Sequence, residues 1–259
     1  MGKIIAIANQ KGGVSKTTST FNIAAVLASK DKRVLMIDFD SQASLTISAG
    51  LEPRDYENNI VSVLTNKTKK DIIQDCIVPL ENIPNLFLLT SIIDLARVEL
   101  ELQGRTARER VLSRALEPIC NDFDFILIDC PPQLSVLTLN ALAASDYVLV
   151  PCKTDYLSYR GLEQLEETIE DVKDCLNSKI KMLGVIATFY EKASSDDNDI
   201  LQGLKDKYNV IGVIKKSVEV KKGIYDGIPI VLSKSKTDMV KEMSKEYETI
   251  VSEYLLKAE

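Results

Sequence analysis

The chain has few of the features that mark a membrane, secreted or zinc-binding protein. No apolar run approaches the roughly 20 residues needed to span a bilayer, and no charged and apolar leader precedes the first predicted strand. The five cysteines are odd in number and scattered, which is neither a disulfide framework nor a zinc-binding spacing. Repeats, low-complexity tracts and long linkers are also missing. We therefore expect a reduced cytoplasmic protein.

Length and composition are those of a folded globular protein. The 259 residues are long enough to bury a full core, and 45% are hydrophobic and 27% charged. The net charge of −6 argues against a wholly basic surface, yet residues 205–236 hold eight lysines against three acids. Such a local excess is typical of a face that meets nucleic acid or another anionic surface, but also of an ordinary solvated surface. Both interpretations stay open.

Apolar runs bounded by turn residues predict the strands. Several are rich in Ile, Leu and Val without polar alternation, which is typical of strands covered on both faces, as in a parallel sheet. The predicted strands are residues 3–8, 33–39, 86–89, 123–129, 147–150, 182–187, 210–214 and 228–232.

Helical patterns alternate with these strands. Leu162, Leu165 and Ile169 begin a series with steps of three and four that forms one apolar face, and residues 237–257 repeat the pattern. Strands alternating with helices predict βαβ crossovers and a doubly wound α/β fold, with a mostly parallel sheet and helices on both faces. Residues 52–82 are the least regular part, and we interpret them as an insertion within a single domain spanning residues 1–259.

The run NQKGGVSKTT, residues 9–18, lies between the first predicted strand and a helix expected to begin near Thr17. Gly12 and Gly13 allow the backbone to turn and aim its amide hydrogens at phosphate oxygens, and the helix N-terminus adds partial positive charge. Lys16 supplies a charge for the β- and γ-phosphates, and the Thr17 hydroxyl suits Mg²⁺. A plain polar turn is the alternative. We expect the whole loop to contact ATP: Lys11, Gly12, Gly13, Val14, Ser15, Lys16, Thr17 and Thr18.

The pattern KGGxxK[TS], with Lys11 before the glycines, resembles the deviant Walker A motif of the ParA/MinD family of ATPases. The resemblance covers essentially the whole chain and is closest to the ParA (Soj-type) partition ATPases. In that family the first lysine reaches across a dimer interface to the partner's ATP. The resemblance therefore implies an ATP-bound homodimer, with Lys11 and Lys16 both catalytic. From the residues alone, Lys11 is an additional cation near the phosphates.

Two aspartates end the second predicted strand, in RVLMIDFDSQAS at residues 33–44. Because Asp38 and Asp40 are two positions apart, both carboxylates are expected to point the same way, where they can orient water or hold metal-bound water. The family has DxDPQ here, so the resemblance implies that Asp40 positions the attacking water. Ser41 replaces the proline of that motif. Helix capping by Asp40 is the alternative.

The run FDFILIDCPPQLS, residues 123–135, has the form of a Walker B strand. An aspartate at the strand end, here Asp129, holds Mg²⁺ through water or through Thr17. Pro131 and Pro132 cannot extend the strand, and the resemblance implies that this turn senses the γ-phosphate. An apolar strand that happens to end in an acidic turn is the alternative.

The resemblance weakens toward the C-terminus. Family members carry DNA-binding arginines near the last predicted strands, whereas this chain has FYEKASSDD, VIKKSVEVKK and LSKSKTD without one arginine. Lysines can substitute, because non-specific DNA binding requires charge more than a forked donor. The candidates are Lys215, Lys216, Lys221, Lys222, Lys234 and Lys236. Residues 213–217 correspond to the region where family members hold the adenine.

These motifs predict a Mg²⁺-dependent ATPase in DNA segregation. The resemblance implies an ATP-bound dimer that binds DNA non-specifically at the nucleoid and is released when a ParB-like partner stimulates hydrolysis. A MinD-like regulator ends in a basic membrane-binding helix, whereas this chain ends SEYLLKAE, so we expect no membrane binding. An iron–sulfur reductase would need paired cysteines, and Cys130 and Cys152 lack a suitable context. A tyrosine kinase would need a tyrosine-rich tail.

Ser15 stands where such a loop usually has glycine. If the position requires a positive φ, a Cβ there costs on the order of 1–2 kcal/mol, which corresponds to about a tenfold loss in ATP affinity. The serine hydroxyl recovers part of this if it donates to a phosphate oxygen. We hypothesise that ATP binds more weakly, or turns over differently, than with glycine at this position.

Overall fold

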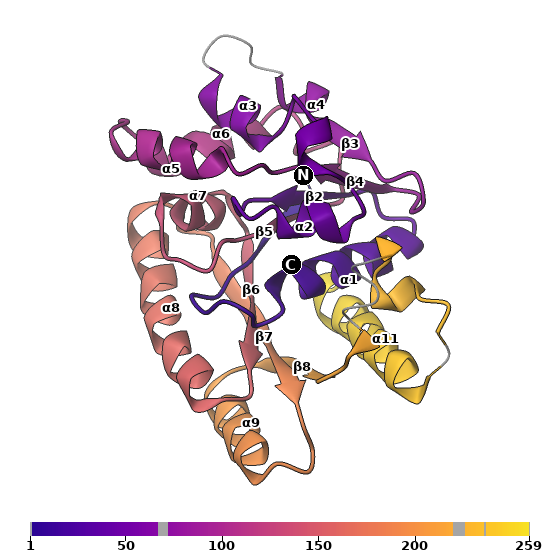
Figure 1. The fold of residues 1–259 in the computed structure, drawn as a ribbon. Coiled ribbons are helices and arrows are strands. Elements are labelled where there is room, and N and C mark those ends of the chain that lie inside the picture. The colour runs from indigo at the N-terminus through magenta and orange to yellow at the C-terminus, as the bar shows by residue number, and fades with distance from the viewer. Residues whose placement is uncertain (1, 67–71, 220–225, 236, 259) are drawn as a thin grey trace.

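One sheet of eight strands forms the centre of the molecule (Figure 1). The computed structural model describes residues 2–66, 72–219, 226–235 and 237–258. The strand order is β3-β4-β2-β5-β1-β6-β7-β8, and every described pairing is parallel except that of β3 with β4. The strands are β1 (Lys3–Ile7), β2 (Val34–Asp38), β3 (Ile77–Pro79), β4 (Leu86–Leu89), β5 (Phe125–Asp129), β6 (Tyr147–Lys153), β7 (Lys181–Tyr190) and β8 (Val210–Lys215).

Helices cover both faces of this sheet, as the sequence predicts. The α-helices are α1 (Lys16–Ser29), α2 (Ser44–Ser48), α3 (Ile60–Thr65), α4 (Ile72–Asp75), α5 (Leu95–Gln103), α6 (Val111–Leu116), α7 (Val136–Ala144), α8 (Tyr156–Cys175), α9 (Ser195–Lys207) and α11 (Asp238–Ile250). Short 3-10 segments are η1 (Pro53–Asp55), η2 (Arg108–Arg110) and η3 (Ile230–Leu232), and a π-helical segment, η4 (Val251–Leu255), follows α11. No helix in the described part of the chain is both long and apolar enough to cross a membrane.

Two hydrophobic clusters, one on each face, hold the helices to the sheet. Along β1, Ile4 and Ala6 point into the cluster that includes α7 and α8, whereas Ile5 and Ile7 point into the cluster that includes α1 and α11. All four are 5% exposed or less, because successive side chains of a strand face opposite sides and both sides are covered. The doubly wound fold is therefore confirmed.

Residues 228–232 do not form the strand that their apolar run predicts. Pro229 lacks an N–H group for a sheet ladder, and residues 230–232 form the 3-10 turn η3 instead. The Val231 N–H donates to Asn22 Oδ1 on α1 at 3.1 Å, so its partner is a side chain rather than a neighbouring strand. The described sheet therefore ends at β8.

The region 52–82, the least regular part of the sequence, is built from short elements in its described residues. It contains η1, α3 and α4, and it ends in β3, which pairs antiparallel with β4 and so extends the sheet at its edge. The three residues of β3 are half-buried or exposed and include Pro79, so they show none of the long apolar pattern that marks the central strands. That short edge strand could not be recognised from the sequence.

Candidate functional site

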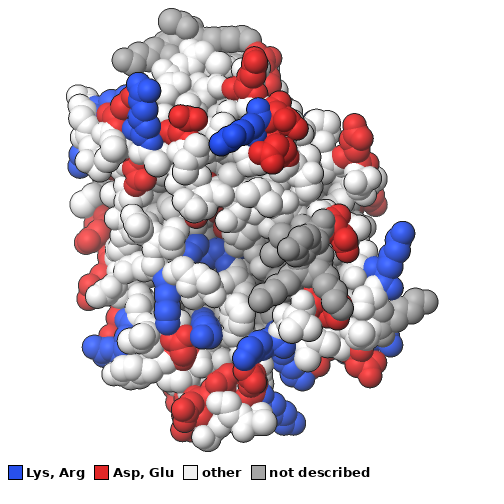
Figure 2. Space-filling model, in the orientation of Figure 1, with Lys and Arg blue, Asp and Glu red and all other residues white. Residues whose placement is uncertain are grey.

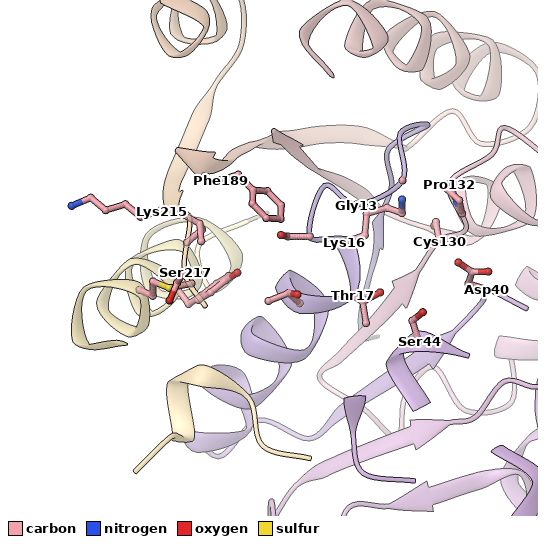
Figure 3. Close-up of a pocket in the computed structure, with 16 residues that line it drawn as sticks. Gly13, Lys16, Thr17, Asp40, Ser44, Cys130, Pro132, Phe189, Lys215 and Ser217 are labelled. Atoms are coloured by element: carbon pink, nitrogen blue, oxygen red, sulfur yellow. The ribbon is translucent and has the colours of Figure 1, made fainter. Parts of the chain in front are cut away.

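A cavity of about 350 Å³ opens at the carboxyl ends of the parallel strands. It lies between the loop that follows β1 on one side and the ends of β7 and β8, with α11, on the other (Figure 3). Ligands of open α/β sheets bind at this edge, where strand connections diverge to the two sides. The lining residues are Gly12, Gly13, Ser15, Lys16, Thr17, Thr18, Asp40, Ser44, Cys130, Pro132, Phe189, Ile214, Lys215, Ser217, Met243 and Tyr247.

The backbone of the predicted phosphate loop turns through two left-handed residues. Gly13 has φ 71°, and an added Cβ there would meet nothing within 4 Å, so the glycine serves the conformation and not a packing contact. Ser15 has φ 68° and ψ 29°, and its side chain makes no capping bond to α1. The backbone at Ser15 therefore has the positive φ that strains a residue with a Cβ, and Ser15 lines the cavity.

The loop's two lysines occupy different positions. Lys16 lines the cavity, is 8% exposed, and donates from Nζ to the carbonyls of Asn9 and Lys11 at 3.2 and 3.1 Å. Burial lowers the pKa of Lys16, although nearby carboxylates oppose the effect. Lys11 is not among the lining residues, and its Nζ lies 2.7 Å from Asp155 Oδ1 at the start of α8.

Asp155, which the sequence did not single out, has an unusually acidic carboxyl group. Burial alone would raise its pKa, but hydrogen bonds from Lys11, Ser158 and Lys153 outweigh burial and lower the pKa to about 2. The same carboxylate caps α8 by accepting from the Ser158 N–H at 2.8 Å. Asp155 therefore holds Lys11 as a charged pair outside the cavity lining.

Thr17 and Asp129 meet as the two motifs predict. The Thr17 hydroxyl donates to Asp129 Oδ2 at 2.6 Å, while Asp129 Oδ1 is buried and has no hydrogen-bond partner among the described residues. Burial, reinforced by Asp38, raises the pKa of Asp129 to about 8 despite the hydrogen bond from Thr17 and the charge of Lys16. A buried carboxylate oxygen without a partner is costly, and a cation beside it would remove that cost.

Asp38 and Asp40 do not point the same way, contrary to expectation. Asp38 ends β2, is fully buried, and accepts from the Thr46 N–H and hydroxyl at 2.8 and 2.7 Å. Asp40 lies beyond the strand, is half-buried, and lines the cavity. The alternation rule failed because β2 ends at residue 38.

Asp38 is thus a structural carboxylate that fixes the start of the segment carrying Asp40. It also accepts from the Asp40 N–H at 3.3 Å, and burial raises its pKa to about 6 against its hydrogen bonds. Ser91 supports the same segment, since its hydroxyl donates to the Asp40 carbonyl at 2.8 Å. Asp40 itself accepts from the Gln42 N–H at 3.0 Å, which is a local turn contact and not a helix cap.

The end of the cavity away from the phosphate loop is mostly apolar. Phe189, Ile214, Met243 and Tyr247 line it, together with Ser217. The sequence indicated the segment 213–217 by resemblance only, and Tyr247 falls in the helical pattern predicted over residues 237–257. Tyr247 is indeed fully buried, with its hydroxyl 3.5 Å from Ser19 Oγ on α1, but it also forms part of the cavity wall. No local signal in the sequence identified Phe189 or Met243.

The predicted DNA-binding lysines are only partly described. Lys215 pairs with Glu242 at 2.6 Å and Lys216 with Glu191 at 2.7 Å, while Lys234 is exposed. Lys221, Lys222 and Lys236 lie outside the described residues. On the face shown in Figure 2, basic side chains are interspersed with acidic ones and form no continuous basic surface. Among the described members of this set, Lys215 and Lys216 are thus each paired with an acidic side chain.

The fold and the loop between β1 and α1 define a P-loop ATPase of the deviant Walker A class. A family model described as an AAA domain matches residues 2–182. The sporulation initiation inhibitor protein Soj of Bacillus subtilis is 38% identical over 235 residues, which are 90% of this chain and 91% of Soj. The chain belongs to the ParA/Soj family of partition ATPases.

Solved structures share the fold over nearly the whole chain. Cobyrinic acid a,c-diamide synthase from Mycobacterium smegmatis, with bound ATP analogue and magnesium, is 34% identical with a TM-score of 0.78, and the match covers 96% of this chain and 92% of that one. A putative plasmid partition protein from Borrelia burgdorferi bound to AMPPNP is 28% identical with a TM-score of 0.80, and the match covers 99% of both chains.

Proposed function

We propose that the chain is a nucleotide-switched DNA partition ATPase whose residues 1–259 form a single P-loop domain. It binds ATP with Mg²⁺, dimerises, and holds DNA non-specifically in that state. Hydrolysis, stimulated by a ParB-like partner, releases the DNA, and the protein acts at the nucleoid in the cytoplasm. The observation that carries the proposal is the different placement of the two loop lysines: Lys16 lines the cavity, whereas Lys11 is outside its lining and paired with Asp155.

The phosphate loop has the groups that a triphosphate requires. Residues 11–18 bind the phosphates through backbone N–H groups and through Lys16. Among the described residues, the Lys16 ammonium donates to two carbonyls, which phosphate oxygens can replace as acceptors. Val14 acts indirectly, because its side chain is buried and its carbonyl accepts from the Thr188 hydroxyl at 3.2 Å. Val14 therefore anchors the loop to β7, while its neighbours face the ligand.

The residues around Thr17 fit Mg²⁺. The unpaired oxygen of Asp129, the Thr17 hydroxyl and the Asp40 carboxylate offer the hard oxygen donors that this ion prefers. The described residues contain no group of three His, Cys, Asp or Glu side chains that could hold a metal alone, which suits an ion that keeps waters and nucleotide phosphates as ligands. When bound, the ion neutralises charge on the phosphates.

Asp40 orients the attacking water. It lies on the cavity wall with its backbone held by Asp38 and Ser91, so its carboxylate is presented on a supported turn. A positioned carboxylate contributes about 10²–10⁴-fold to such a reaction. Lys16 stabilises the charge that develops on the phosphates.

Lys11 acts on a second copy of the chain. Its ammonium is partly exposed, outside the lining of its own cavity, and paired only with Asp155 among the described residues. An exposed pair of this kind is worth about 0–1 kcal/mol, so exchanging Asp155 for a partner's phosphate costs little. This supports the homodimer and the catalytic role of Lys11 in the partner's site.

Neither alternative function receives comparable support. Cys130 and Cys152 are 1% and 0% exposed, so neither sulfur reaches a surface where a cluster shared by two subunits would sit. Val251 and Leu255, in the segment after α11, are fully buried against the α1 side of the sheet. Their apolar side chains are therefore used for packing and are not presented to a bilayer.

DNA retention tests the proposed function. Purified protein should remain on non-specific DNA with ATP, and not with ADP or without nucleotide, and retention should weaken as salt rises. Replacing Lys216, Lys221 and Lys222 with glutamate should abolish retention while ATP binding persists, because Lys216 is not among the residues that line the cavity. Retention that is independent of nucleotide, or absent at low salt, would contradict the partition function. Unchanged retention by the glutamate variant would remove these lysines from the DNA interface.

A further inference from the structure

We propose that the edge of the sheet opposite the nucleotide cavity holds a second ligand site, which binds a small phosphorylated molecule. Two cavities of about 560 and 360 Å³ lie there, beside the first residues of β1, β5, β6 and β7. Gly2 and Lys3 line both, so the two cavities meet at the start of β1. Neither shares a lining residue with the nucleotide cavity, and the site is therefore separate from it.

The linings of these two cavities are basic although the chain as a whole is acidic. The net charge of the chain is −6, yet the linings hold five lysines against two aspartates. The lysines come from the start of β1, the segment after α1, the end of α8 and the connection into β7: Lys3, Lys32, Lys173, Lys179 and Lys181. The fold thus gathers positive charge from four separate parts of the chain at one place.

Most of this positive charge is not neutralised by acidic side chains. Lys173 lies in the last turn of α8 and pairs with Glu170 at 3.3 Å, so the ion pair and the helix dipole account for it. Lys32, Lys179 and Lys181 lie outside the helices and form no ion pair with any described residue. Their ammonium groups are free to bind an anion.

The two aspartates of the linings are held by the backbone and not by these lysines. Asp146 Oδ2 accepts from the Ile4 N–H at 2.9 Å, and Asp124 Oδ2 accepts from the Arg33 N–H at 2.8 Å. Neither carboxylate forms an ion pair with a described residue. Each therefore fixes the start of a neighbouring strand, while the lysines around it keep their charge.

Lys3 lies where the two cavities meet and is half-buried. Its ammonium donates to the Ala258 carbonyl and lies 5.9 Å from the centroid of the Phe125 ring, so its partners among the described residues carry no full negative charge. The backbone beneath it is tightly packed, because a Cβ added at Gly2 would collide with the Phe123 carbonyl oxygen. A phosphate oxygen would supply the missing negative charge at a firmly held position.

The size and lining of the cavities indicate the class of ligand. Volumes of several hundred Å³ are those of cavities that enclose small molecules, and lysine binds phosphate as a point charge. Tyr147 and Ile180 line the larger cavity, and Phe123 and Leu256 line the smaller one, so apolar surface lies beside the charge. This combination suits a small organic molecule that carries phosphate groups.

Calorimetric titration of inorganic triphosphate into protein saturated with ADP and Mg²⁺ tests the proposal, because the nucleotide site is then filled. Wild type should bind one triphosphate per chain, and the affinity should fall as salt rises. A double variant with Lys179→Ala and Lys181→Ala should bind triphosphate about 100-fold more weakly, since each lost charge-assisted contact corresponds to about tenfold. Its affinity for ADP should equal that of wild type.

A double variant with Lys205→Ala and Lys245→Ala is the matched control. These lysines of α9 and α11 are also exposed and form no ion pair with a described residue, but they line neither cavity. Both double variants lose the same net charge, and the control should bind triphosphate like wild type. Acetylation of lysines followed by mass spectrometry gives a second readout, in which triphosphate should protect Lys179 and Lys181 and leave Lys205 and Lys245 reactive.

Binding of triphosphate no tighter than about 1 mM by the ADP-saturated wild type would overturn the proposal. So would equal losses in the two double variants, because the effect would then come from net charge alone. Protection of Lys179 and Lys181 by duplex DNA and not by triphosphate would assign this edge to DNA instead. ADP affinity, measured on the same protein, tests the ATPase function separately.

Discussion

The two ends of the nucleotide cavity are built in opposite ways. The phosphate end comes from one continuous run, residues 9–18, joined by single aspartates that end or follow neighbouring strands. The other end is assembled from β7, β8 and α11, segments that are separated in the sequence and meet only in the folded chain. A loop that must surround phosphate requires glycine, lysine and threonine in order, whereas an apolar wall accepts many side chains.

This difference explains where sequence reasoning succeeded. The phosphate loop, the α1 helix after it and the contact between Thr17 and Asp129 were all predicted, because each depends on short-range order or on a strand end. The doubly wound sheet was predicted for the same reason, since its buried strands are continuous apolar runs.

The failures have equally specific causes. Residues 228–232 have the composition of a strand, but Pro229 lacks an N–H group and the Val231 N–H donates to the side chain of Asn22. The segment therefore forms a 3-10 turn. In the sequence, Asp38 and Asp40 are equally good candidates for a site residue. They differ because β2 ends at Asp38, which the sequence does not show. Phe189 gave no signal because a bulge and a positive φ depend on the pairing of two strands, which no local pattern records.

Lys16→Ala should cause the largest loss of ligand affinity, and the loss should come from contacts at the phosphate end alone. Removing a buried ammonium that binds phosphates should weaken ATP and inorganic triphosphate by about 100-fold each, the loss of a strong charge-assisted contact. Calorimetric titration measures both affinities. If Lys16→Ala lost affinity for ATP but not for inorganic triphosphate, Lys16 would not belong to the phosphate end of the cavity.

Asp40→Asn should separate binding from chemistry. Hydrolysis should fall at least about 100-fold, because the amide cannot orient water as the carboxylate does, while ATP affinity stays within about threefold. Single-turnover hydrolysis and titration measure the two quantities. Asp38→Asn is the control for a structural carboxylate. The buried Asp38 accepts hydrogen bonds from Thr46, so its replacement should lower Tm. Full activity in Asp40→Asn would assign the water to another residue.

Ser15→Gly should increase ATP affinity or turnover by changing the phosphate end of the cavity. Glycine relieves the left-handed backbone at φ 68°, so ATP should bind up to about tenfold more tightly or turn over faster. Titration and steady-state hydrolysis are compared with wild type. Identical behaviour of the two proteins would show that the serine is neutral here and that its hydroxyl offsets the strain.

Asp155→Asn should have the smallest effect, because Asp155 lines neither end of the cavity. Asparagine retains helix capping, so the variant removes only the charge that pairs with Lys11 and Lys153, and the loss of stability should be below about 1 kcal/mol. The folded pKa of about 2 is depressed, so the contribution is present above the unfolded value and is lost as pH falls toward 2. Urea unfolding at pH 7 and pH 3 measures this.

In the same assay, a wild-type advantage that grew on acidification would contradict the ion pair. Lys11→Ala provides the reciprocal control, because it removes the other charge of the pair. Its loss of stability should be of similar size at pH 7.

The most direct test of the nucleotide switch is the mass of the protein in solution, measured by sedimentation with ATP, with ADP and without nucleotide. We expect a monomer in the last two conditions and a dimer with ATP. That dimer should persist longer in Asp40→Asn and should not form in Lys11→Ala. One mass under all three conditions, or a dimer in Lys11→Ala equal to that of wild type, would contradict the role of Lys11 between two copies of the chain.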